Sequence, residues 1–479
     1  MMKHGYITVY LSMMTGVLLA LVLTVIEGVR MHTIRTQTEC VTDMALDSAL
    51  AEYHRELLKQ YDLFFIDTSY GSGFPSCINT AEHIQKYMNL NFQPLTVRDI
   101  PVGKDLTGLT ADMVTVIEAA AAADDNCAVL KQQIADYMRN RWGIGYLNRA
   151  KKQADRISGE GYLSGNWENR RIQTERHVKN TILQKQQEEK DEEVQNVELP
   201  SDVVNQARSM GVLAHASGNA AKLSRKQIVT EKLFSSREDP LEGTGIPEGK
   251  TSDSGIIDTG LCYRYILEKC GYYGHVKENS AFSYQVEYIL AGKNNDMENL
   301  RNVANQLLMI RETANTIYLF GDSGKRAEAE GTALILTSLL GLPELTEPVT
   351  DLILFAWAYA ESVQDLRILF DGGKIPFVKD DDTWNTPYRH LLTFQNHLSE
   401  YHSVQSGMSY ADYLEALLYL KQENQNLKRL MDVIEADIRM TPGNNLFRID
   451  GCVNALTVEA KVSSRFGYQY EIIRKCRYE

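Results

Sequence analysis

The chain of 479 residues lacks the patterns that identify several large classes of protein. Its seven cysteines are too few and too scattered for a disulfide scaffold, and none has the Cys-x-x-Cys spacing of a zinc site. No run of lysine and arginine stands out and the formal net charge is −13, so nucleic acid is not expected as a partner. The composition, with 44% hydrophobic residues, is that of a globular protein of two or three domains.

Nucleotide-binding and catalytic motifs are also missing. The stretch FGDSGKRAE at 320–328 fails the phosphate-loop pattern, because Leu319 and Arg326 stand where that pattern requires a glycine and a hydroxyl. We expect Asp322 or Ser323 to cap a helix there instead. No serine or cysteine has the local sequence of a catalytic nucleophile. The sequence therefore predicts a protein that is not an enzyme and that carries no cofactor.

Groups that could hold a metal ion are incomplete. His390 and His397 are seven residues apart and could share one face of a helix, but no third ligand has a suitable spacing. The three aspartates at 380–382 lack the alternating spacing of a calcium-binding EF-hand loop. We expect no metal site, and a loop over 370–384 that packs through its apolar residues.

What the sequence does contain begins with an uncharged apolar run over residues 6–26. As a helix it would span about 31 Å, the thickness of a bilayer core. A secretory signal has a shorter run that ends at a small-residue cleavage site, whereas this run ends in VIEGVR. Tyr6 and Tyr10 lie near one border and Glu27 and Arg30 at the other, as headgroup regions favour. The sequence therefore predicts a transmembrane helix that is retained.

The helical pattern continues beyond the apolar run. Residues 31–63 contain no proline or glycine, and apolar or aromatic residues recur at every fourth position from Val41 to Tyr61. We expect the membrane helix to continue as one long amphipathic helix to about residue 63. A further helix is expected from Thr110 to Trp142.

Changes in composition suggest how the rest is organised. Residues 146–195 are strongly polar, as in a solvated helix or a mobile arm, and residues 235–255 have the proline, glycine and serine content of a linker or long loop. The predicted organisation has five parts: a leader at 1–5, a transmembrane helix at 6–26, a helical stalk with the first part of the extracellular region at 27–234, the linker at 235–255, and a helix-rich domain at 256–479.

The second half of the chain has the pattern of helices followed by strands. Apolar runs at 333–342 and 352–360 are too short to span a membrane and predict core helices. From residue 445 the period changes to two, which predicts antiparallel strands. Cys452 and Cys476 could form a disulfide across that hairpin, or stay as free buried thiols. The expected fold class is α+β and mainly helical, with an N-terminal transmembrane helix and a small C-terminal antiparallel sheet.

The segment HGYITVYLSMMTGVLLALVLTVIEGVRM resembles the N-terminus of minor pseudopilins of tight-adherence (Tad) pilus systems. The resemblance rests on Lys3, Gly5, Thr8-Val9 and the motif IEGVR at 26–30. The stretch AESVQDLRILFDGGKIPFVK is similar to an uncharacterised family of long single-pass surface proteins of Gram-positive bacteria, to which no activity is assigned.

This resemblance implies prepilin-type processing between Gly5 and Tyr6. The fifth residue of the processed chain would then be Tyr10, where pilins carry a glutamate that pairs with the amino terminus of a neighbouring subunit. Because tyrosine cannot supply that charge, the departure favours a retained anchor over a filament subunit.

We therefore expect a non-enzymatic, single-pass membrane protein with its N-terminus in the cytoplasm and its large domain outside. It would be a pseudopilin-like or accessory component of a pilus or type II/IV-like secretion system. Its expected partners are the membrane and other subunits of that system, and no small-molecule ligand can be inferred. Two alternatives stay open: a surface adhesin or binding protein with the same anchor, and an anchored extracellular hydrolase with an unrecognised site.

Overall fold

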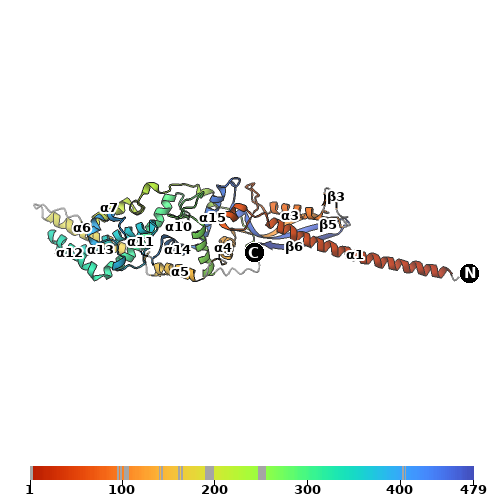
Figure 1. Ribbon diagram of the computed structural model, residues 1–479, viewed down its shortest axis with the longest axis horizontal. Coiled ribbons are helices and arrows are strands. Elements are labelled where there is room, and N and C mark those ends of the chain that lie inside the picture. The colour runs from red at the N-terminus through yellow and green to blue at the C-terminus, as the bar shows by residue number, and fades with distance from the viewer. Residues whose placement is uncertain are drawn as a thin grey trace. The chain divides into compact units, whose positions relative to one another are not determined.

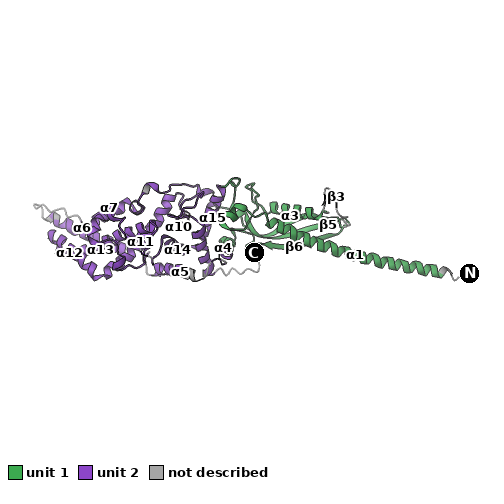
Figure 2. Ribbon diagram, viewed as in Figure 1, with its two compact units in different colours: residues 1–133, 238–253, 441–479 green, residues 134–237, 254–440 purple. Residues whose placement is uncertain are grey.

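The computed structural model describes residues 4–93, 96–97, 100–101, 107–139, 141, 144–159, 162, 166–188, 199–245, 255–401, 404, 406–465 and 467–478. The chain forms two compact units (Figure 2). Unit 1 comprises residues 1–133, 238–253 and 441–479, and unit 2 comprises residues 134–237 and 254–440. The chain thus divides differently from the expected parts at 27–234 and 256–479, because its last strands belong with the N-terminal residues. Residues 1–3 of the expected leader lie outside the described residues.

Unit 1 combines one long helix with a small antiparallel sheet (Figure 1). Its elements are α1 (His4–Leu50), α2 (Arg55–Tyr61), β1 (Ile66–Asp67), α3 (Cys77–Phe92), β2 (Thr96–Val97), β3 (Ile100–Pro101), β4 (Leu109–Ala121), the start of α4 (Asp124–Arg139), the 3-10 turn η7 (Ile449–Gly451), β5 (Cys452–Ser464) and β6 (Gln469–Arg477).

The long N-terminal helix is confirmed, but it ends earlier than expected. The predicted apolar stripe is buried at Val41, Ala45 and Ala49. After Leu50 the chain turns, and α2 begins as a separate helix capped by His54, whose Nδ1 accepts the N–H of residue 57 at 3.2 Å. The expectation of one helix to about residue 63 is therefore wrong.

β5 lies at the centre of the main sheet. It pairs with β4 along one edge and with β6 and β1 along the other, and all these pairs are antiparallel. The helix expected from Thr110 to Trp142 is wrong over its first half, because β4 pairs with β5 in a register that places Val116 opposite Val458. The alanines at 119–123 favour a helix in isolation, but pairing with a distant strand outweighs that preference.

α1 and α3 pack against the same hydrophobic core as the sheet (Figure 1). Ala45 of α1, Ile84 and Met88 of α3, and Val458 and Ala460 of β5 have no exposed surface. The expected C-terminal antiparallel strands are confirmed, and they pack on the long helix.

Residues 238–245 of the expected linker are ordered within unit 1, whereas its residues 235–237 belong to unit 2. The N–H of Leu241 donates to Asp450 at 2.9 Å, and the N–H of Gly243 donates to Asp124 at 2.6 Å. The hydroxyl of Thr244 donates to the carbonyl of Ala119 at 2.9 Å, on the outer edge of β4. Residues 246–254 of that stretch lie outside the described residues.

Unit 2 is helical. It contains the end of α4, then α5 (Ile144–Gly159), α6 (Asn166–Glu188), α7 (Pro200–Met210), α8 (Val212–Ala216), η1 (Ala220–Lys222), η2 (Thr230–Lys232), η3 (Phe234–Ser236), α9 (Ile256–Lys269), α10 (Gln285–Ala291), α11 (Asp296–Gly321), α12 (Ser323–Leu339), η4 (Pro343–Leu345), α13 (Thr346–Phe370), η5 (Asp381–Thr383), η6 (Tyr388–His397), α14 (Tyr410–Leu420) and α15 (Glu423–Arg439). The polar stretch expected at 146–195 is helical over 146–159 and 166–188, and Tyr162 between them is in a turn. Residues 160–161, 163–165 and 189–195 lie outside the described part.

α13 is the central helix of unit 2. Residues 349–366 of it are all buried, which confirms the core helix expected at 352–360. The indole of Trp357 donates to the carbonyl of Thr386 at 2.7 Å. The run at 333–342 is different, because α12 buries only one side and leaves Leu334, Ile335 and Leu339 more than half exposed. The expectation that this run is a core helix is therefore correct for only one of its faces.

Candidate functional site

The N-terminal half of α1 is not covered by the rest of the described chain. Every residue from Tyr6 to Ile26 is exposed, and the first buried residue of the helix beyond them is Ile34. Among the described residues, α1 is the helix long and apolar enough to cross a membrane. Within this segment Thr15 and Thr24 donate to backbone carbonyls one turn earlier, at 2.9 and 2.8 Å, so these hydroxyls need no water. The segment is suited to a hydrocarbon environment.

Glu27 marks the point where this segment ends. It is the first residue after Tyr6 that is not exposed, and its carboxylate lies 3.7 Å from Nη1 of Arg30. The hydroxyl of Tyr468, just before β6, donates to Glu27 Oε1. This hydrogen bond raises the pKa of Tyr468, because a phenolate would face the carboxylate. The structure thus brings the two expected border residues together with a tyrosine from the C-terminal hairpin.

Further polar contacts attach the C-terminal strand to α1. The hydroxyl of Tyr470 lies 3.3 Å from Glu39, and Nε of Arg474 lies 3.1 Å from Asp43. The hydroxyl of Tyr478 donates to the last carbonyl of α1. These residues have even numbers and so share the face of β6 that α1 covers. Sequence reasoning missed this set, although alternating tyrosines in the final strand were a visible signal.

The residues expected to be processed lie at the far end of α1. Gly5 is in its first turn, and the side chains of Tyr6 and Tyr10 are 77% and 69% exposed. The next carboxylate along the helix is Glu27, about 25 Å from Tyr10 at 1.5 Å per residue. Processing between Gly5 and Tyr6 stays a prediction.

The two C-terminal cysteines lie apart. Cys476 is opposite Leu456 in the β5–β6 register, and Cys452 is four residues earlier on β5, about 13 Å away along the strand. A disulfide requires Cα atoms within about 7 Å, and neither cysteine is in a disulfide. The disulfide that the sequence left open is therefore not formed. Burial raises the pKa of the Cys476 thiol to about 11, which makes it a poor nucleophile.

An open cavity of about 420 Å³ lies beside Cys476 in unit 1. The hydroxyl of Thr457 donates to the carboxylate of Glu118 at 2.7 Å, and Nζ of Lys475 lies 3.7 Å from the same carboxylate. The charged side chains that line the cavity are two acids, Asp47 and Glu118, and two bases, Lys475 and Arg477. These side chains give the lining no net charge.

Unit 2 contains a buried ionic network that sequence reasoning also missed. Nε of Arg311 lies 2.9 Å from Asp365 Oδ2, Nζ of Lys379 lies 2.6 Å from Asp365 Oδ1, and Lys379 also pairs with Glu361. All four side chains are fully buried. Burial alone would raise the pKa of Asp365, but Lys379 and Arg311 outweigh it and hold this pKa below its ordinary value.

The network links α11, α13 and the loop that follows α13. Two cations and two carboxylates balance, which is the condition under which buried charges are tolerated. The signal in the sequence was the spacing of Glu361 and Asp365, one turn apart in an otherwise apolar helix. This arrangement is structural, because the charges are satisfied by one another.

The motifs that the sequence analysis considered in the second half of the chain contact other residues of the same unit. Asp322 Oδ1 accepts the N–H of Lys325 at 2.9 Å, which confirms the predicted helix cap. The side chain of Lys325 pairs with Asp381, the middle aspartate of the acidic loop. The rings of His390 and His397 are stacked at 3.9 Å. Among the described residues no group of three or more histidine, cysteine, aspartate or glutamate side chains could hold a metal ion.

Comparisons with known proteins give one match. No curated protein and no solved structure matches the chain. The model of a family of unknown function, DUF5702, matches residues 187–464, which is more than half of the chain. The chain therefore belongs to this family of unknown function.

Proposed function

We propose that this protein is a membrane-anchored extracellular component of a pilus or of a type II/IV-like secretion system, pseudopilin-like or accessory and without enzymatic activity. The observation that carries the proposal is the two-part form of α1. Its first part, residues 6–26, is apolar and exposed, while its second part packs on an antiparallel sheet. A helix of this form can hold a folded unit at the surface of a bilayer or within an assembly of similar helices.

The N-terminal resemblance to Tad pseudopilins supports the same role. Lys3, Gly5 and the IEGVR motif at 26–30 supply that resemblance, and Tyr10 favours an anchor that remains in the membrane. We propose a cytoplasmic N-terminus with both units outside. Expected partners are other subunits of the assembly.

N-terminal sequencing of the protein purified from its own membranes tests processing. If a prepilin-type peptidase acts here, the mature chain begins at Tyr6, and a Gly5→Leu variant keeps its leader. An unprocessed wild-type chain would leave a plain anchor and would contradict the pseudopilin-like form of the proposal.

Cysteine labelling of intact cells tests topology. In a Cys40→Ser background, Ser236→Cys should react with a membrane-impermeant maleimide, because residue 236 is exposed and would lie outside. Lys3→Cys in the Gly5→Leu variant, which keeps its leader, serves as the matched control and should react only after permeabilisation. The reverse pattern would overturn the proposed orientation.

Deletion of the gene tests the role itself. Loss of surface filaments or of secreted cargo, restored by the wild-type chain, is the expected result. Filaments and secretion that are unchanged in the deletion strain would contradict the proposal.

A further inference from the structure

One face of α12 is exposed and largely apolar. It consists of residues that recur three or four positions apart along the helix: Gly324, Ala327, Gly331, Leu334, Ile335, Ser338 and Leu339, here called the α12 face. The opposite face is in the core, where Ala329, Ala333 and Thr337 have no exposed surface. Leu334 is 54% exposed, and Ile335 and Leu339 are each 64% exposed.

No other part of the described chain fills the space over this face. A Cβ atom added at Gly331 would meet no atom within 4 Å. Small residues at 324, 327, 331 and 338 would let another backbone approach closely, while the leucines and isoleucine provide apolar area at the C-terminal end. A contiguous exposed apolar surface of this kind marks an interaction site more often than an isolated leucine does.

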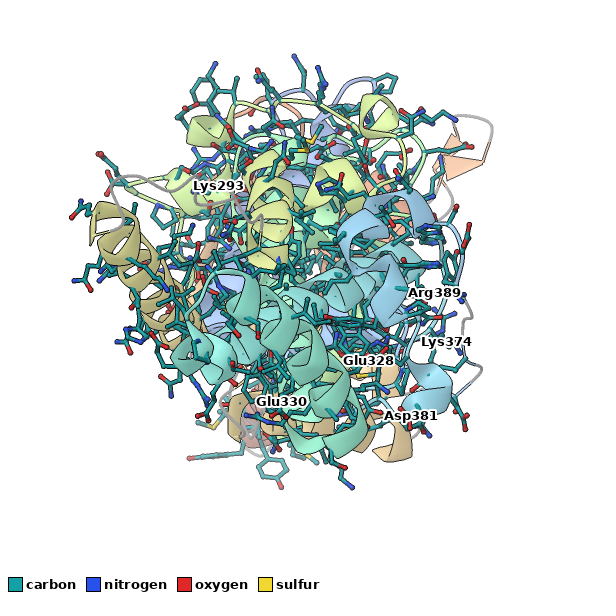
Figure 3. All side chains as sticks on the ribbon, turned by 90° about the vertical axis from the view of Figure 1, so that its left-hand side faces the viewer. Lys293, Glu328, Glu330, Lys374, Asp381 and Arg389 are labelled. Atoms are coloured by element: carbon teal, nitrogen blue, oxygen red, sulfur yellow. The ribbon has the colours of Figure 1, made fainter. Side chains whose placement is uncertain are left out.

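The charged side chains that α12 itself places beside this face are acidic. Glu328 and Glu330 are exposed and are labelled in Figure 3. Being two residues apart, they project about 200° apart around the helix and so lie on opposite flanks of the face. The two basic residues of the helix point elsewhere, since Lys325 pairs with Asp381 and Nη1 of Arg326 lies 3.7 Å from Asp351.

We propose that the α12 face is a docking surface for an amphipathic helix of another protein, with leucine-sized apolar side chains and lysine or arginine beside them. The charge pattern selects this occupant. Residues 189–198 of the chain itself carry five carboxylates against the single cation Lys190, and Glu328 and Glu330 would repel this net negative charge. Anionic lipid headgroups would be repelled in the same way.

A second copy of the chain fits less well than a basic helix. In a parallel pair of α12 helices, Glu328 and Glu330 would face their own counterparts. In an antiparallel pair they would be desolvated against Leu334 and Leu339 of the other copy, and an unpaired buried carboxylate is costly.

A binding experiment with the full chain in phosphatidylcholine nanodiscs tests the proposal. The probe is a fluorescent 18-residue helical peptide of leucine and lysine, and its matched control has glutamate in place of lysine. Empty nanodiscs measure binding to lipid. We expect the lysine peptide to bind the wild-type chain at least tenfold more tightly than the glutamate peptide, and more weakly as salt is added.

Variants separate the apolar and charged parts. Ile335→Gln with Leu339→Gln, and separately Glu328→Lys with Glu330→Lys, should each weaken binding of the lysine peptide at least tenfold. Gly331→Trp should block the face without touching the core, whereas Gly331→Ala should bind like the wild type. The proposal is overturned if the variants bind like the wild type, if both peptides bind equally, if binding is to lipid alone, or if the chain self-associates through Ile335.

Discussion

The hydroxyl of Tyr468 donates a hydrogen bond to the carboxylate of Glu27, although 441 residues separate them in the sequence. Glu27 ends the exposed apolar segment of α1, and Tyr468 leads into the last strand of the sheet. The bond therefore joins the border of the exposed apolar segment directly to the folded part of unit 1. Together with the contacts of Tyr470 and Arg474, it fixes which side of α1 faces the sheet.

Replacing the carboxylate of Glu27 should remove the charged acceptor of the Tyr468 hydrogen bond. In Glu27→Gln the pKa of Tyr468 should fall toward its ordinary value, because the hydrogen bond to a charged acceptor is its largest cause of elevation. Titration of an assigned ¹³Cζ-tyrosine signal measures this. The pKa of Tyr478, which burial raises, should not respond and serves as the control. An unchanged Tyr468 would contradict the contact.

The free energy of unfolding of unit 2 should decrease as the pH is raised from 5 to 8. Burial raises the pKa of Glu287 to about 7. Its carboxylate accepts hydrogen bonds from the N–H of Tyr273 and the hydroxyl of Tyr410, both at 2.8 Å, which lower this pKa but do not outweigh burial. Burial likewise raises the pKa of Glu312 to about 7. An acid whose pKa is higher in the folded state contributes stability that is complete below its unfolded pKa and is lost as pH rises through the folded one.

Glu287→Gln should flatten this pH dependence. The difference between pH 5 and pH 8 in the free energy of unfolding should shrink by an amount of order 3 kcal/mol, as about 1.4 kcal/mol per pKa unit implies. Urea unfolding at both pH values measures it. The exposed Glu330→Gln should leave the difference unchanged, and an equal slope in both variants would rule out Glu287 as its source.

Breaking the buried network should be costly. Lys379→Met removes the cation shared by Glu361 and Asp365, and it should lower the free energy of unfolding by about 3–5 kcal/mol. Asp365 keeps its pair with Arg311, so adding Glu361→Gln removes the carboxylate that has lost its cation and should recover part of the loss. Denaturant unfolding monitored by tryptophan fluorescence measures both. A wild-type stability in Lys379→Met would contradict the network.

The thiols should differ strongly in reactivity. Cys40 is exposed, whereas Cys476 has a pKa of about 11 and would be roughly 0.03% thiolate at pH 7.5. Iodoacetamide labelling followed by peptide mass spectrometry should modify Cys40 much faster. Non-reducing electrophoresis should show no species linked through Cys452 and Cys476. Equal labelling rates, or such a link, would contradict the structure.

A charge in the middle of the apolar segment should prevent stable insertion. Leu18→Arg places arginine at the centre of the 6–26 segment, at a cost of about 2.5–3.5 kcal/mol. Carbonate extraction should release more of this variant from membranes than of the wild type. Met44→Arg, at an exposed position of α1 beyond that segment, is the matched control and should stay membrane-bound.

The sequence was most informative where local pattern decides structure. The apolar run to Ile26, the cap at Asp322 and the alternation in the last strands each follow from neighbours within a few residues. β4 was missed because its alanines favour a helix and its partner β5 lies more than 300 residues away. The contact between Tyr468 and Glu27 was out of reach for the same reason.

Predicting which faces of a helix are buried was a separate difficulty. The runs at 333–342 and 352–360 have similar composition, yet α13 is enclosed while α12 keeps one side open. Which faces are covered depends on neighbouring helices, which a pattern along one segment does not specify. The pairing of Lys379 and Arg311 with two carboxylates of α13 was hidden likewise, because the four residues of the network come from three separate elements.

Because β5 is central in the sheet but late in the sequence, the main sheet can be completed only near the end of synthesis. β4 leaves the ribosome about 330 residues before β5, which at roughly 5–20 residues per second is a delay of about 17 to 66 s. During that interval α1 has emerged, and the edge of β4 that pairs with β5 in the finished sheet has no partner strand. We therefore expect unit 1 of a chain arrested before residue 452 to aggregate rather than fold.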